Sequence, residues 1–218
     1  ENQVNQIILD NENIKKLQEG EARYNVNKPT VKQGVERENT VEEKMDVTQG
    51  KLVIGYDVEI NEKDLENKKF RYAGMLYNAI LGGTATSKLF QNVREKASLA
   101  YTANSSFSYY TGNIFVMAGI EIENYQKAVD IIKEQLDAME NGDFSEEDLS
   151  NAKKVIISNI EGISDEQDTE LIYFLGQELT GNNVSLDKYI EFVKGVSRQE
   201  IEEFAKKVKI NTIYFLRN

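Results

Sequence analysis

The sequence predicts an α+β fold in which a mostly antiparallel sheet carries helices packed against it. Three observations lead to this class. Residues 51–60 alternate between apolar and polar side chains, residues 99–122 have the pattern of a hairpin, and residues 125–208 follow the 3.6-residue period of helices. A last strand at residues 210–216 completes the order: strand, two helices, hairpin, several helices, strand.

Residues 1–49 differ in composition from the rest of the chain. Most of the stretch from residue 20 to residue 50 is polar and charged, with Pro29 and Gly34 as breakers. We expect residues 1–49 to be a linker, a surface strap or the tail of a preceding domain, with disorder as the alternative for the first part. Residues 50–218 are expected to form one domain. Because the chain begins at Glu1 and not at Met, we also expect a piece of a longer protein.

The domain begins with a strand followed by two helices. Asn61 or Asp64 can cap the first helix, and Gly82-Gly83 ends it. Ser87 can cap the second helix, which is short. The strand places five apolar side chains on one face, namely Leu52, Ile54, Tyr56, Val58 and Ile60.

The next pattern is a hairpin. Residues 99–110 and 114–122 are the two strands, and Thr111-Gly112-Asn113 forms the tight turn between them. The second strand has apolar residues on both faces. We therefore expect it to be central in the sheet and covered on both sides.

The second half of the chain is helical until the last strand. One stripe runs from Tyr125 to Met139, and Asn141-Gly142 stops it. Ser145 and Ser197 each begin a capping-box pattern. The helix after Ser145 is expected to run with a break near Gly162, and a shorter helix covers residues 186–193.

Composition excludes several classes of function. The net charge of −11 argues against a nucleic-acid partner, since phosphate binding needs clustered Lys and Arg. No apolar run reaches the roughly 18 residues of a membrane helix, and no signal segment opens the chain. The absence of cysteine agrees with the cytoplasm. We therefore expect a cytoplasmic protein with no membrane partner.

The candidate site residues lie in the segment from Leu81 to Tyr101. A glycine hinge, a short amphipathic helix and a strand entry follow one another there, and Arg94 and Tyr101 lie seven residues apart across the helix-to-strand junction. Taken singly, Arg94 fits a surface cation near a helix C-terminus and Tyr101 fits a half-buried strand tyrosine. Together they resemble one half of an active site. Because the chain has no histidine and no cysteine, the other half would lie on another polypeptide or another part of this one.

Several motifs carry a resemblance to a known family. They are Leu81-Gly82-Gly83, Ser87-Lys88-Leu89-Phe90, Val93-Arg94-Glu95-Lys96, Leu99-Ala100-Tyr101, residues 142–149, Leu175-Gly176 and residues 196–201. With them the chain resembles the second, non-zinc domain of the insulinase/pitrilysin metallopeptidases, in particular the mitochondrial-processing-peptidase-like group. The resemblance covers about residues 31–218, and residues 50–56 are most similar to a bacterial subgroup that has lost the zinc site.

The resemblance implies that two domains contribute different parts of one active site. In this family the zinc-bearing domain carries a His-x-x-Glu-His motif, which a chain without histidine cannot supply. No cofactor is therefore expected on this chain, and zinc is expected only on a partner domain or subunit. The resemblance implies that Arg94 and Tyr101 are catalytic residues on the opposite wall of a peptide chamber. Tyr101 would donate a hydrogen bond to the carbonyl oxygen where negative charge develops, and Arg94 would hold backbone carbonyls.

Alone, the chain is expected to be inactive. Its expected partners are the zinc-bearing domain or subunit and an unfolded peptide. Two other functions remain open: a scaffold that stabilises an active relative, and a peptide-binding module that uses a strand edge without hydrolysis. The acidic groups at Glu121/Glu123, residues 146–148 and Glu202-Glu203 are interpreted as solvated faces.

Overall fold

The computed structural model describes residues 39–180 and 184–218. Its centre is one five-stranded sheet with the strand order β1-β5-β2-β4-β3. The strands are β1 (Asn39–Lys44), β2 (Gly50–Val58), β3 (Ala100–Ser108), β4 (Asn113–Ile120) and β5 (Val208–Arg217). All neighbouring pairs are antiparallel except β1 and β5, which are parallel. The predicted α+β class is confirmed.

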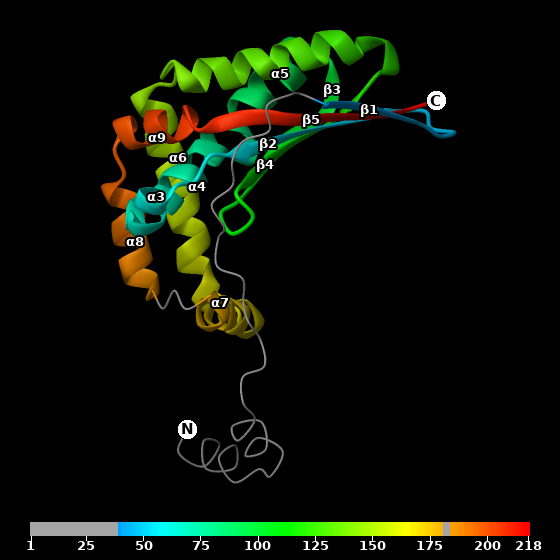
Figure 1. Cartoon of the computed structure of the whole chain (residues 1–218). Helices are drawn as coiled ribbons and strands as arrows, with labels where there is room; N and C mark the ends of the chain where they lie inside the picture. The colour runs from blue at the N-terminus through cyan, green and yellow to red at the C-terminus, as the bar shows by residue number, and fades with distance from the viewer. Residues whose placement is uncertain (1–38, 181–183) are drawn as a thin grey trace, which may run out of the picture.

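Helices fill the two long connections between strands (Figure 1). Between β2 and β3 lie α3 (Glu62–Glu66), α4 (Lys68–Asn78) and two π-helical segments, η1 (Ala79–Gly83) and η2 (Phe90–Lys96). Between β4 and β5 lie η3 (Ile122–Asn124), α5 (Tyr125–Glu140), α6 (Glu146–Glu161), η4 (Gly162–Asp165), α7 (Gln167–Thr180), α8 (Leu186–Gly195) and α9 (Arg198–Ala205). None of the described helices is both long and apolar enough to cross a bilayer.

One face of the sheet is buried under the helices. The alternation predicted for β2 is confirmed, since Leu52, Ile54, Tyr56 and Val58 are buried on this face. Phe204 of α9 is buried against the rings of Phe70, Tyr77 and Phe107, and so ties the last helix to α4 and β3. The η1 and η2 segments pack against β3, with Leu81 and Val93 buried.

The other face of the sheet is open. Apolar side chains on this face include Val41 of β1, Val53 of β2, Phe115 and Met117 of β4 and Tyr214 of β5, which neighbour one another across the strands. We call them the open sheet face. Phe115 and Met117 are exposed. The prediction that the second hairpin strand is covered on both sides is therefore wrong: β4 is interior in the strand order, but within residues 39–180 and 184–218 helices cover only one of its faces.

Three local predictions also change. Asn61 caps α3 as predicted, but the helix expected to continue to Ile80 is divided, because Asn67 ends α3 and caps α4. The hydroxyl of Ser87 is buried and has no hydrogen-bond partner among the described residues, so the predicted side-chain cap is not formed. The structure also places residues 39–44 in the sheet as β1, within the segment that the sequence analysis assigned to a linker or strap.

The capping boxes at Ser145 and Ser197 are both formed as predicted, and the break near Gly162 is the 3-10 segment η4. The division of the chain at residue 50 stays a prediction, and the part of it that concerns residues 1–38 lies outside the described residues.

Candidate functional site

Arg94 lies in the last turns of η2, on the outside of the domain. Val93, next to it, is fully buried and anchors the segment, which turns the Arg94 side chain toward solvent. The guanidinium carbon lies 4.6 Å from the centre of the Phe90 ring, and Nε lies 3.7 Å from Oε1 of Glu95. The flat face of the guanidinium is thus supported by an aromatic ring.

The chain turns sharply between η2 and β3. Ser98 has a φ of 51°, the left-handed conformation that non-glycine residues seldom adopt. The N–H of Leu99 then donates to the carbonyl of Val93, and Leu99 is buried. This turn brings the start of β3 beside Arg94.

Tyr101 lies at an irregularity of the β3–β4 ladder. Ala100 pairs with Ile120 and Thr102 pairs with Gly119, so Tyr101 is an extra residue in β3. Such bulges redirect side chains. The Tyr101 side chain is 62% exposed, and its hydroxyl donates to Oε1 of Glu121 at 2.7 Å. This hydrogen bond and the carboxylate charge raise the pKa of Tyr101 above its ordinary value.

Arg94 and Tyr101 line the same pocket, whose volume is about 360 Å³. The other lining residues are Glu95, Ser98, Leu99, Ala100 and Glu121. The structure therefore brings the two predicted residues together at an accessible hollow. Glu121 was interpreted as part of a solvated face, and it is exposed; the structure adds that its carboxylate lines the pocket and is bonded to Tyr101.

The pocket offers a guanidinium, a carboxylate and a phenol to a ligand. Such a set can hold a peptide backbone, because the guanidinium and the phenol donate hydrogen bonds and the carboxylate accepts them. It does not fit a zinc ion. The chain has no histidine, and the described residues include no group of three or more Asp or Glu arranged to hold a metal.

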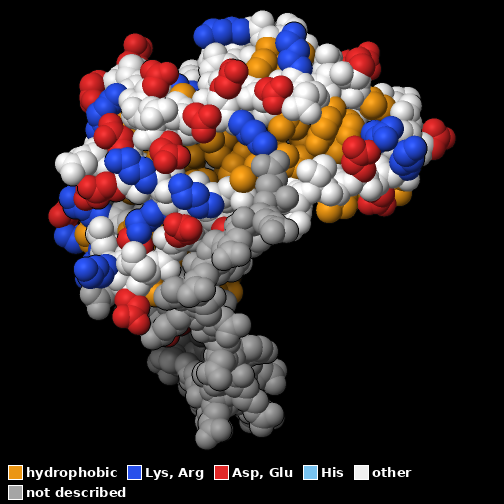
Figure 2. Space-filling view, turned by 45° about the horizontal axis from the view of Figure 1, so that its top comes forward, with side chains coloured by type: hydrophobic (Ala, Val, Ile, Leu, Met, Phe, Trp, Pro, Cys, Tyr) orange, Lys and Arg blue, Asp and Glu red, His pale blue; other side chains and the backbone are white. Residues whose placement is uncertain are grey.

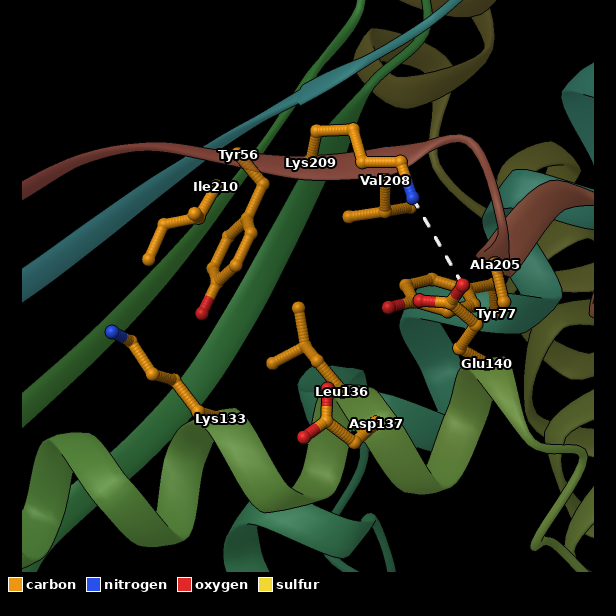
Figure 3. A pocket seen from close by; sticks show the side chains of 10 residues that line it. All are labelled: Tyr56, Tyr77, Lys133, Leu136, Asp137, Glu140, Ala205, Val208, Lys209 and Ile210. Atoms are coloured by element: carbon orange, nitrogen blue, oxygen red, sulfur yellow. Dashed lines mark ion pairs between the residues drawn. The ribbon is translucent and has the colours of Figure 1, made fainter. Parts of the chain in front are cut away.

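A second pocket of about 260 Å³ lies between α5 and the strands β2 and β5. Figure 3 shows Tyr56 extending from β2 toward α5, on which Lys133 and Leu136 lie. Hydrophobic side chains gather in the hollow beside α5 (Figure 2). At its rim Lys209 Nζ lies 3.9 Å from Oε1 of Glu140.

Sequence reasoning did not find this second pocket, because its walls come from four segments that are separated in the sequence, at residues 56, 77, 133–140 and 205–210. Tyr77 lines it, and burial raises the pKa of this phenol far above its ordinary value. The phenol therefore stays protonated even at alkaline pH, where an exposed tyrosine ionises. None of the predicted site residues lies in this pocket.

A family model described as "Peptidase M16 inactive domain" matches residues 4–156. Over 173 residues the chain is 39% identical to a Bacillus subtilis protein named "Probable inactive metalloprotease YmfF", a match that covers 79% of this chain and 39% of that protein. Over 141 residues it is 26% identical to "Uncharacterized zinc protease YmxG" of the same organism, covering 63% of this chain and 34% of the relative.

Solved structures with the same fold include a conserved protein from Enterococcus faecalis, with a TM-score of 0.76 and 28% identity. That match covers 92% of this chain and 45% of the other. A peptidase M16 inactive domain from Pseudomonas fluorescens has a TM-score of 0.65 at 16% identity, covering 83% and 43%, and shows the fold alone. The chain spans less than half the length of these relatives.

Proposed function

The chain belongs to the family of M16 peptidase inactive domains, and on that premise we propose that it is the non-zinc domain of a peptidase assembly. The family predicted from the sequence is thereby confirmed. In this proposal the domain forms one wall of a chamber that encloses an unfolded peptide. A zinc-bearing domain, on the same polypeptide or on another, forms the opposite wall.

The observation that carries the proposal is the shared pocket of Arg94 and Tyr101. Hydrolysis of a peptide bond places negative charge on the carbonyl oxygen, and a phenol aimed at that oxygen stabilises the charge as it develops. A guanidinium beside it holds neighbouring backbone carbonyls in place through its fixed donors. Both groups are exposed and line the same pocket, so both could contact one bound peptide.

The open sheet face supports the role as a wall. Phe115 and Met117 present apolar side chains to solvent on β4, and the ring of Phe115 lies over Gly55 of β2. Contiguous exposed apolar surface on a domain marks a site of interaction. Extended, unfolded peptides expose the apolar side chains that would bind such a surface.

The experiment combines this chain with the zinc-bearing domain of the same organism that carries the His-x-x-Glu-His motif, and measures peptide hydrolysis. Tyr101→Phe removes one donor to the carbonyl oxygen and should lower kcat by about a hundredfold, with a much smaller change in KM. Tyr214→Phe is the control for kcat, since the Tyr214 hydroxyl also donates to a carboxylate, Glu43, at 2.6 Å, but lies outside the pocket; because Tyr214 belongs to the open sheet face, this variant can change KM but should leave kcat unchanged. Equal losses in the two variants would contradict the assignment.

Measurements on the same pair of domains also distinguish two other functions. If Tyr101→Phe and Arg94→Ala both leave hydrolysis unchanged, the domain acts as a scaffold for its partner. A peptide-binding module without hydrolysis is favoured by the position of β3, which is an edge strand and can pair with an extended peptide. Binding of an unfolded peptide by this chain alone, with no gain in hydrolysis after the zinc-bearing domain is added, would support that function.

A further inference from the structure

Helix α7 presents a wide apolar face to solvent. Leu171, Ile172, Phe174 and Leu175 are all exposed, with Leu171 at 67% and Ile172 at 69%. Gln177, on the opposite side of the helix, is buried. Large apolar side chains that cluster on one helix, unlike those scattered singly, mark a surface for a partner. We call these four residues the α7 face.

The α7 face continues into a groove of about 280 Å³. Ile172 and Tyr173 form one wall of the groove, and Tyr110, at the tip of the β3–β4 hairpin, forms part of the other. Further lining comes from Ile160, Ile163 and Tyr189. The one cation in the lining, Arg71, donates to the Tyr110 hydroxyl at 3.2 Å and lies 5.4 Å from the centre of that ring. The groove therefore suits an apolar side chain.

The charged residues of η4 and α7 themselves all have one sign, and the cation in the adjoining groove, Arg71, is already bonded to Tyr110. Residues 161–180 contain six acidic residues and no Lys or Arg. Two copies of this chain docked through their α7 faces would oppose these acidic rims, and a nucleic acid or an anionic membrane would be repelled. Charge complementarity thus selects a protein segment with an apolar ridge and a basic rim.

We propose that the α7 face and its groove dock a basic, amphipathic segment of the zinc-bearing domain. This inference rests on the proposed function, which requires such a partner. The matched relatives are more than twice as long as the part that this chain covers, so a second domain of similar size accompanies this fold in them. Figure 1 shows α7 beyond the tip of the β3–β4 hairpin, so a domain held there would also lie next to the strand that carries Phe115 and Met117.

The experiment measures binding of this whole chain to the separately produced zinc-bearing domain of the same organism, by calorimetry and by light scattering. The variant Leu171→Gln/Ile172→Gln/Leu175→Gln should bind at least tenfold more weakly while its melting temperature stays unchanged, because the three side chains are exposed. Val155→Gln, an exposed apolar position on α6 outside the α7 face, is the matched control and should bind like the wild type. Asp168→Lys/Glu178→Lys should weaken binding and reduce its dependence on salt.

Several results would overturn the inference. One is unchanged affinity of the triple variant, and another is a wild-type chain that does not bind the zinc-bearing domain. A third is a dimer of this chain alone that the triple variant converts to monomers, which would make a second copy the occupant. Tyr101→Phe tests the proposed function separately: it should bind with wild-type affinity but hydrolyse slowly, so the two proposals can fail independently.

Discussion

The hydroxyl of Tyr101 donates its proton to Glu121 Oε1 across 2.7 Å, at the open end of the β3–β4 hairpin. A phenol has one proton to donate. While Glu121 holds it, Tyr101 cannot donate to a peptide carbonyl as well. A neutral carbonyl is a weaker acceptor than a carboxylate, whereas the oxyanion of the transition state is a strong one. In the proposed role, the Tyr101 hydroxyl would leave Glu121 and donate to the peptide carbonyl oxygen only as negative charge develops on that oxygen.

Glu121→Gln should lower the pKa of Tyr101 toward 10, because the hydrogen bond to the carboxylate is the main cause that raises it and the carboxylate charge is the second. Tyrosine ring carbon chemical shifts, followed from pH 8 to pH 12, measure this pKa. Glu43→Gln is the matched control, since it should lower the pKa of Tyr214 and leave that of Tyr101 unchanged. An unchanged pKa of Tyr101 in Glu121→Gln would show that the contact is not kept in solution.

Arg94→Lys keeps the positive charge but removes the planar donor fork. If Arg94 holds peptide carbonyls, KM for an unfolded peptide should rise severalfold in the assembled enzyme, with kcat reduced less. Arg217→Lys is a suitable control, because Arg217 is also a partly exposed arginine paired with a carboxylate, Glu42, but it lies at the end of β5 outside the pocket. A fall in kcat alone would assign Arg94 to the transition state.

The sequence was sufficient for features that depend on local pattern. The period of two in residues 51–60 and the capping boxes at Ser145 and Ser197 need only neighbouring residues, and each is present in the structure. Strand β1 was missed because all six of its residues are exposed and its sequence has no apolar alternation. It is a strand because its backbone pairs with β5, about 170 residues later, and no local signal reports such a pairing.

In the candidate site, too, some features follow from local sequence and others depend on pairing between distant residues. Arg94 and Tyr101 were found through a motif, but the bulge that exposes Tyr101 depends on the register of β3 against β4. Glu121 was missed although a signal existed. A tight turn at residues 111–113 brings the two outer ends of the hairpin together, and Tyr101 and Glu121 occupy those ends. The ladder itself pairs Ala100 with Ile120. Glu121 was instead grouped with Glu123 as a solvated face, without regard to the strand opposite it.

Two helical glycines should respond in opposite ways to the same substitution. A Cβ on Gly74 of α4 would lie 2.5 Å from Cε1 of Phe107 and 2.6 Å from Cε2 of Phe204, two rings packed in the core. Gly74→Ala should therefore lower the free energy of unfolding by about 1–3 kcal/mol.

A Cβ on Gly176 of α7 meets no atom within 4 Å, so Gly176→Ala should raise the free energy of unfolding by about 0.5–1 kcal/mol through lower backbone entropy in the unfolded chain. Urea unfolding measures both changes. If Gly74→Ala is instead more stable than the wild type, the rings of Phe107 and Phe204 must be able to move aside for the added methyl group.

Alkaline pH should destabilise the domain through its buried tyrosines. Burial raises the pKa of Tyr72 to about 12, although the charge of Arg71 acts in the opposite direction. In the unfolded chain this phenol ionises near pH 10. Between pH 10 and pH 12 the unfolded state thus loses a proton that the folded state keeps, and the free energy of unfolding falls as pH rises. Below pH 10 the effect is absent.

Tyr72→Phe removes this ionisable group while keeping the ring that stacks on Phe192 at 5.1 Å between centres. Between pH 9 and pH 12 the variant should lose about 2 kcal/mol less unfolding free energy than the wild type, as two pKa units imply. Tyr77 and Tyr189, whose pKa values burial also raises, leave a residual decline in the variant. Urea unfolding at each pH measures the difference, and parallel curves for the two proteins would show that the Tyr72 hydroxyl reaches solvent in the folded domain.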